Sequence, residues 1–213
     1  MKNVLLLPIL AALVPAAMAT AQEIPDSCQP GALAGDSDAA RLQCDIDRAA
    51  ILADRSERLF NISVEPMVRI VDTVASPSGA VYVYDVVEEL GVLTLDARSV
   101  PADMSDTSRV PVCRLRTILT DDAATSIPAA LVEASSPDVP GYAERLEVVI
   151  NPDGSRSYAL LLEGSHDIVT TIHTADGERS FSRNTGQSDM VADLNNTIIG
   201  VANVSNGWTC NAD

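Results

Sequence analysis

Four cysteines constrain the fold of this chain more than any other feature of its sequence: Cys28, Cys44, Cys113 and Cys210. All four follow a segment with the features of an export signal. An even number of cysteines in an exported chain indicates two disulfides. A zinc site would require close C-x-x-C pairs or suitably spaced histidines, and the sequence has neither. Cross-linking is therefore the expected use of these cysteines.

The export signal occupies the N-terminus. A short positive start precedes an apolar run from Val4 to Ala17, and two A-x-A sites follow, the second ending at Ala21. The run is too short to span a membrane. We expect cleavage after Ala21, which makes residues 1–21 a signal peptide and places the mature chain in the periplasm or outside the cell. No later run reaches spanning length, so no membrane span is expected.

The sequence alone allows three disulfide connectivities. We favour Cys28–Cys44 because this pair closes a short loop, and local partners meet at the lowest entropic cost. The second bridge, Cys113–Cys210, would then pin the C-terminal tail to the body of the protein. Trp208, the only tryptophan, offers apolar surface to bury beside that bridge.

The charge balance limits the possible partners. The chain has a net charge of −16, and its only lysine, Lys2, would leave with the signal peptide. Nucleic acids and anionic membrane surfaces require basic patches, so we expect neither as a partner. A charge of this sign favours solubility and would attract a cationic partner.

A helix is predicted over about Asp38–Phe60. Asp36 or Ser37 can cap its N-terminus, and apolar side chains recur on one side at 3.6-residue spacing. Those side chains are Leu42, Ile46, Ala49, Ala53 and Phe60. Cys44 projects from the opposite side, where Cys28 can reach it as the preceding segment folds back.

After this helix, the pattern of apolar residues changes from that of a helix to that of strands. Turn signals at 76–79, 151–154 and 175–178 group these strands in hairpins. Another helix is expected from a cap at Ser188 or Asp189 to about Val201, although the end of this run also has strand character. The predicted fold is therefore α+β: an antiparallel sheet built from hairpins, covered by an N-terminal and a C-terminal helix and stapled by disulfides. The expected strands are 67–75, 80–89, 92–98, 145–150, 157–163, 166–174 and 179–183.

We expect a single exported domain over residues 22–213, which is long enough for one substantial core. Residues 120–143 are rich in Ala, Ser, Asp and Pro, and they are expected to form a linker or a loosely helical cover. They would mark the boundary of two possible sub-halves. Each half places a cysteine before a hairpin turned by x-Pro-x-Gly, which leaves an old duplication open.

The sequence nominates no catalytic, cofactor-binding or metal-binding residue. The odd separation of His166 and His173 sends them to opposite faces of one strand. Ser165, His166 and Asp167 are the residue types of a catalytic triad, but neighbours along a strand point apart. We interpret these three residues as a polar bend.

Carboxylates are the remaining side chains that could serve in catalysis or metal binding, and they cluster locally in the sequence. Several converging oxygens would suit calcium, and two at the right separation would suit a hydrolase. Helix capping and a solvated acidic face explain the same pattern. The clusters are Asp36 with Asp38, Asp45 with Asp47, Asp103 with Asp106, and Asp121 with Asp122.

These observations favour an exported, non-catalytic binding or cell-envelope-associated protein, whose acidic surface suits another envelope or extracellular protein or a cationic peptide. Two alternatives stay open. One is an acid-dependent hydrolase that acts on an envelope substrate through paired carboxylates, and the other is a calcium-stabilised module.

Overall fold

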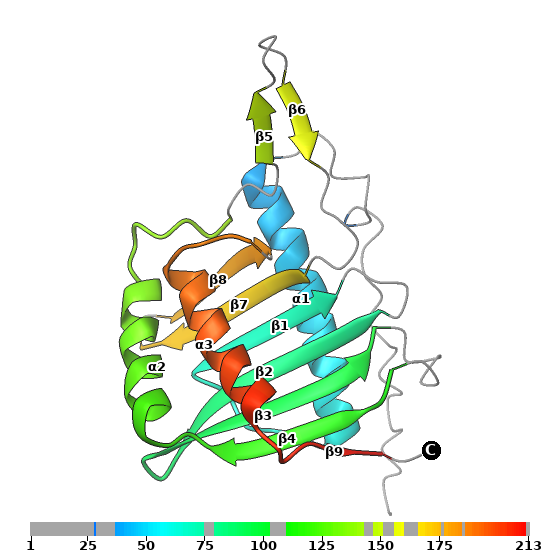
Figure 1. Cartoon of the computed structure of the whole chain (residues 1–213), viewed down its shortest axis with the longest axis vertical. Coiled ribbons are helices and arrows are strands. Elements are labelled where there is room, and N and C mark those ends of the chain that lie inside the picture. The colour runs from blue at the N-terminus through cyan, green and yellow to red at the C-terminus, as the bar shows by residue number, and fades with distance from the viewer. Residues whose placement is uncertain are drawn as a thin grey trace, which may run out of the picture.

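The computed structural model describes Cys28 and residues 37–74, 79–102, 110–142, 147–150, 156–159, 166–175, 177–184 and 186–211. Within them the chain forms an antiparallel sheet of seven strands, a separate two-stranded sheet and three helices (Figure 1). The predicted α+β fold, with an N-terminal and a C-terminal helix and two disulfides, is confirmed. The signal peptide and the turn at 151–154 lie outside the described residues.

The large sheet has the strand order β8–β7–β1–β2–β3–β4–β9, and neighbouring strands are antiparallel. Its strands are β1 (Val68–Val74), β2 (Ala80–Glu89), β3 (Val92–Pro101), β4 (Cys113–Ile118), β7 (His166–Thr174), β8 (Gly177–Asn184) and β9 (Thr209–Cys210). The small sheet pairs β5 (Glu147–Ile150) with β6 (Arg156–Ala159). The helices are α1 (Asp38–Phe60), α2 (Asp121–Ala134) and α3 (Met190–Val204). Of these described helices, none is long and apolar enough to cross a membrane.

The first helix, α1, begins and ends where the sequence predicts. The Ser37 hydroxyl accepts a hydrogen bond from the Ala40 amide at its N-terminus, and Asn61 ends it in the left-handed conformation. Its apolar side packs on one face of the sheet, which we call the α1 face. The buried residues of this contact are Ala49, Leu52, Ala53, Val71, Val81, Val83, Val100 and Val169.

The opposite face of the sheet, which we call the α3 face, carries the larger core. Helices α2 and α3 lie in front of the sheet in Figure 1, and α1 lies behind it. Ile70 and Leu95 point to the α3 face and pack with Ile127 of α2 and Leu194 of α3. The central strands are therefore buried on both faces, which explains their nearly unbroken apolar sequences.

One element was not expected from the sequence: residues 113–118 form β4, where no strand was predicted. Residues 121–134 form a helix, α2, so of the two alternatives for this segment, a linker or a loosely helical cover, the structure shows the helical one. Ile127 is fully buried and Leu131 largely so, and burial of this apolar side against the sheet stabilises the helix.

The two halves of the sequence share the large sheet. β7 pairs with β1 over seven residues, from Val68 opposite Ile172 to Val74 opposite His166. β1 consequently lies between β2 of its own half and β7 of the other. The small β5–β6 hairpin stands apart from this sheet (Figure 1).

Both predicted disulfides are present. Cys28 is bonded to Cys44 across 16 residues, and Cys113 to Cys210 across 97. Cys113 and Cys210 are direct register partners on β4 and β9. Trp208 anchors the tail beside them, because its indole Nε1 donates a 3.1 Å hydrogen bond to the carbonyl oxygen of Ala202.

Candidate functional site

Charged side chains occupy the α1 face where the sheet extends beyond the end of α1. Alternation along β2, β3 and β4 directs Asp85, Asp96, Arg98, Arg114 and Arg116 to this face. Asp85 is the direct register partner of Asp96, and Arg98 is that of Arg114. Like charges directly opposite each other repel. The arrangement is therefore stable only because arginines flank both aspartates: Arg69 is the direct register partner of Asp85 on β1, and Arg98 and Arg114 reach the aspartates diagonally. We call these five residues, with Arg69 of β1, the charge ladder.

Two arginines hold Asp85. Arg69 Nε donates to Asp85 Oδ1 at 2.7 Å and Arg69 Nη2 to Oδ2 at 3.0 Å, and Arg98 Nη2 also donates to Oδ2. Arg69 further contacts Glu57 of α1. Burial opposes the charged form of Arg69, but hydrogen bonds and charges from Asp85 and Glu57 outweigh it and raise the pKa of this guanidinium. Both oxygens of Asp85 are thus occupied.

Two arginines also surround Asp96. Arg114 Nε donates to Asp96 Oδ1 at 3.2 Å and Arg114 Nη2 to Oδ2 at 2.5 Å. Arg98 Nε lies 3.7 Å from Asp96 Oδ1. The Arg114 guanidinium also lies 5.8 Å from the ring centroid of Phe60, the last residue of α1, within the range of a cation–π contact. The end of α1 therefore helps to orient the ladder.

Arg98 is the central and most deeply buried member of the ladder, with no solvent exposure. Its Nε and Nη1 groups have no hydrogen-bond partner among the described residues, and neither does the buried hydroxyl of Ser56 on α1. A guanidinium in such a place depends on the two carboxylates beside it, since an uncompensated buried charge is costly.

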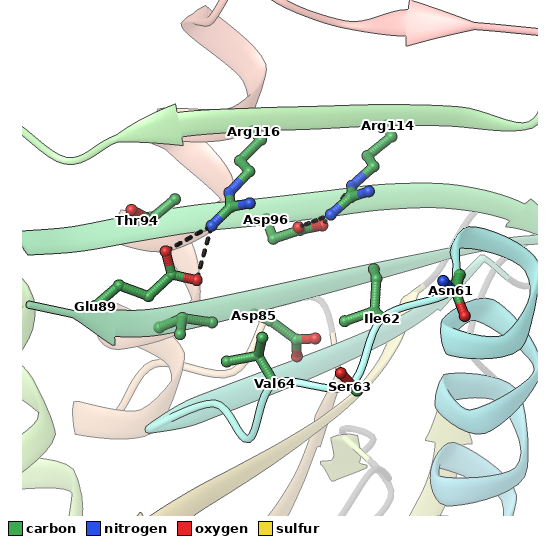
Figure 2. Close-up of a pocket in the computed structure, with 11 residues that line it drawn as sticks. Asn61, Ile62, Ser63, Val64, Asp85, Glu89, Thr94, Asp96, Arg114 and Arg116 are labelled. Carbon is green, nitrogen blue, oxygen red and sulfur yellow. Dashed lines mark hydrogen bonds and ion pairs between the residues drawn. The ribbon is translucent and has the colours of Figure 1, made fainter.

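A cleft of about 280 Å³ lies over the ladder, beyond the end of α1 (Figure 2). Its floor is formed by β2, β3 and β4, and its wall by residues 61–64, which follow α1. Apolar side chains of this wall and of β2 thus meet three carboxylates and two guanidinium groups. The lining residues are Asn61, Ile62, Ser63, Val64, Asp85, Val87, Glu89, Thr94, Asp96, Arg114 and Arg116.

The outer rim of the cleft carries an exposed ion pair. Arg116 Nη2 donates to both carboxylate oxygens of Glu89, at 2.7 and 2.8 Å (Figure 2). The two side chains are 51% and 42% exposed. An exposed pair of this kind contributes about 0–1 kcal/mol. A ligand can therefore replace either Arg116 or Glu89 in this pair at little energetic cost. The buried arginine–aspartate pairs of the ladder do not allow such a replacement.

Exposed apolar side chains are concentrated at the same corner of the molecule. Val64, Leu90, Val92 and Ile118 are exposed there, and together they are half of the large apolar residues exposed in the described chain. Leu90 lies at the tip of the β2–β3 hairpin with a left-handed φ of 54°. A bulky residue rarely adopts that conformation. A cluster of exposed apolar residues is typical of a binding surface.

The two histidines lie on opposite faces of β7, as predicted, because the register of that strand is unbroken. His166 Nδ1 lies 2.8 and 2.9 Å from the two carboxylate oxygens of Asp72 on β1. His173 Nδ1, on the other face, lies 3.7 Å from Glu65 and 3.8 Å from Glu178. The fold does not bring the histidines together.

Asp72, which sequence reasoning did not nominate, is the buried partner of His166. Burial raises the pKa of Asp72, while the hydrogen bond and charge of His166 act in the opposite direction. Of the three residue types considered as a triad, Ser165 lies outside the described residues. The pairing with Asp72 comes from another strand and was not visible in the local sequence.

The locally clustered carboxylates have separate surroundings. Asp38 and Asp122 are exposed in the first turns of α1 and α2, where negative charge is favourable. Asp45 accepts a 2.7 Å hydrogen bond from the Ser182 hydroxyl, and Asp47 one of 2.8 Å from Gln43. The side chains described here include no group of three His, Cys, Asp or Glu arranged to hold a metal ion. Asp36, Asp103 and Asp106 lie outside the described residues, and Asp121 is described only as the first backbone position of α2.

The charge ladder was missed because its members come from different strands and meet only through the register. A signal was present in the sequence: Asp85 interrupts the apolar run of β2, and Asp96 and Arg98 interrupt that of β3. Charges at buried positions of a central strand require partners on neighbouring strands.

No protein-family model, curated protein or solved structure matches this chain.

Proposed function

We propose that this chain is an exported, non-catalytic binding module that holds a cationic, partly aliphatic segment of a partner at the cleft beyond α1. The observation that carries the proposal is the composition of the cleft. An exchangeable carboxylate, Glu89, stands at its rim beside the exposed apolar residues Val64, Val92 and Ile118. The two disulfides and the N-terminal signal sequence support export.

The opposed aspartates favour binding over hydrolysis. A general acid must carry a proton, and a nucleophile or base must present a free oxygen to its substrate. All four carboxylate oxygens of Asp85 and Asp96 instead accept hydrogen bonds from guanidinium groups. Asp85 and Asp96 therefore serve as structural counterions that balance the charge of the arginines.

A positive partner fits the rim and the overall charge. An incoming arginine or lysine can replace Arg116 at Glu89, and the exposed pair that it breaks is weak. The net charge of −16 would attract such a partner over a distance. Salt screens this attraction but leaves apolar contacts intact, so association should slow as salt rises while dissociation changes little.

The test uses a fluorescent peptide with the repeating sequence Val-Thr-Arg-Thr, so that valine and arginine alternate on one side of the extended peptide and threonine lies on the other. Its affinity is measured by fluorescence anisotropy. Glu89→Gln should weaken binding roughly two- to fivefold, and Arg116→Gln should strengthen it by a similar factor because it frees Glu89. Opposite signs from two neutralising changes are a specific signature of exchange at this rim.

Glu133→Gln is the matched control, because Glu133 is exposed on α2 and the change in net charge is the same. Equal losses for Glu89→Gln and Glu133→Gln would mean that net charge alone attracts the peptide, and the proposed site would be wrong. Turnover of an envelope glycan or peptide that disappears in Asp96→Asn would contradict the non-catalytic assignment.

A further inference from the structure

The two edges of the large sheet are covered to different extents. Along β8, residues 135–142 follow the edge: Ser182 N donates to the carbonyl oxygen of Gly141 at 2.7 Å. Arg179 donates to the carbonyl oxygens of Ser135, Ser136 and Val139. This edge is thereby protected from pairing with another chain.

The other edge, β4, is covered over only part of its length. β9 pairs with Cys113 and Arg114 and with no other residue of β4. The tail before β9 lies toward the α3 face, since Gly207 lies against the side chain of Leu115 and the Trp208 side chain bonds to Ala202 near the end of α3. The other four residues of β4, Leu115–Ile118, have no strand beside them on this edge among the described residues.

The backbone groups on this open edge can be identified by alternation. Leu119 N donates to Leu93 O of β3 at 2.8 Å, and Asn211 N donates to Val112 O at 3.0 Å. Odd-numbered residues of β4 therefore direct their amides and carbonyls to β3, and even-numbered residues direct theirs outward. Arg116 and Ile118 thus present outward amides and carbonyls that have no backbone partner in the described part of the chain.

The side chains beside these groups form an apolar strip. Ile118 is 61% exposed on the α1 face. The Arg116 guanidinium reaches inward over β3 to Glu89 (Figure 2), which leaves its methylene stem facing the edge. Glu89, on the inner side of the strip, adds a negative charge beside it.

We propose that the partner segment binds by strand addition: it lies in an extended conformation beside Arg116–Ile118, in line with β9. This inference rests on the proposed function and names its geometry. Aliphatic side chains of the segment cover Ile118, and a basic side chain reaches Glu89. A second copy of this chain is disfavoured as the occupant, because two chains of net charge −16 repel each other.

The first test uses backbone methylation of the valine–arginine–threonine peptide described above. Peptide residues opposite Arg116 and Ile118 place their side chains on the α1 face. The same residues must form the backbone hydrogen bonds to β4. Methylating the valine and arginine nitrogens should therefore abolish measurable binding, and methylating the threonine nitrogens should leave the affinity within twofold. Equal effects of the two methylation patterns would overturn strand addition.

The second test changes the protein. Ile118→Pro removes one amide that points outward and leaves every amide that donates to β3. Proline is tolerated on an edge strand. It should bind the peptide roughly two- to tenfold more weakly than Ile118→Ala, which retains the amide. Equal affinities of these two variants, both shown to be folded by circular dichroism, would contradict the inference.

Hydrogen exchange in the unaltered protein gives a third, independent readout. The amides of Arg116 and Ile118 should exchange rapidly in the free protein and slow at least tenfold when the peptide is added. Peptide binding without this protection would overturn strand addition but leave the proposed function intact, whereas no peptide binding would overturn both. Protection of these amides that rises with protein concentration alone would identify a second copy as the occupant.

Discussion

Asp85 and Asp96 lie directly opposite each other on β2 and β3, and guanidinium groups occupy every oxygen of both carboxylates. This relationship links the fold to the cleft. The pair would be repulsive by itself, so it is stable only while the arginines on both sides and Arg98 between them stay in place.

Replacement of the buried arginine should therefore be severe. Arg98→Met keeps much of the side-chain volume but leaves Asp85 and Asp96 facing each other with less compensation. Loss of one partner from a buried ionic network costs about 3–5 kcal/mol, and we expect a loss of that size in the free energy of unfolding from urea titration. Arg116→Met, which breaks an exposed pair, should cost less than about 1 kcal/mol. Similar losses for the two variants would show that burial does not govern the ladder.

The two disulfides should contribute unequally. The double variant Cys113→Ala/Cys210→Ala opens a loop of 97 residues and should lose on the order of 2–5 kcal/mol. Cys28→Ala/Cys44→Ala opens a loop of 16 residues and should lose less. Chemical unfolding of both double variants against the oxidised parent measures the difference. A larger loss for the local bridge would contradict the loop-closure argument.

The pH dependence of stability should change when Asp72 is replaced. Burial raises the pKa of Asp72 in the folded protein, despite the opposing hydrogen bond from His166. A raised pKa means that the folded state binds the proton more tightly. The stabilising contribution is then complete below the unfolded pKa and is lost as the pH rises through the folded one.

Asp72→Asn abolishes this titration and retains an oxygen that can accept from His166. The free energy of unfolding of the variant, relative to that of the parent, should therefore rise as the pH increases from below about 4, the pKa of an unfolded aspartate, through the higher pKa of folded Asp72. Thermal unfolding across this interval measures the trend. A relative stability that stays level or falls with pH would show that the raised pKa is not coupled to folding.

The expected cleavage after Ala21 has a simple chemical consequence. Lys2 is the only lysine, so a mature chain beginning at Gln22 has at most one primary amine, its N-terminus. An amine-directed reagent should add at most one label per molecule, as measured by intact mass spectrometry. Two or more labels would identify a chain that keeps its signal peptide.

Features with local signals in the sequence were predictable. A capping serine and a 3.6-residue apolar period set the bounds of α1, and the short loop between Cys28 and Cys44 favoured the correct first bridge. β4 was not predicted, although its apolar residues alternate with Arg114 and Arg116 as they do in a strand with one polar face. Those arginines become favourable only beside Asp96 and Glu89, which belong to other strands.

The site was less predictable than the fold for the same reason. The sequence indicates carboxylate clusters only among neighbouring residues, whereas Asp85 and Asp96 meet through the β2–β3 register. His166 likewise finds Asp72 across the β1–β7 pairing. Such contacts depend on strand order, and local patterns do not specify the pairing of β1 with β7.

That pairing also sets an order of events on the ribosome. β1 to β4 can form a hairpin stack as soon as they are synthesised, but the outer edge of β1 has no partner until β7 emerges, and Cys113 must wait for a thiol 97 residues later. During this interval the nascent sheet has two unprotected edges, each a template for pairing with other chains. The chain therefore gains from staying unfolded until its last strand has been made, which is also the state in which an unfolded-chain export pathway would carry it.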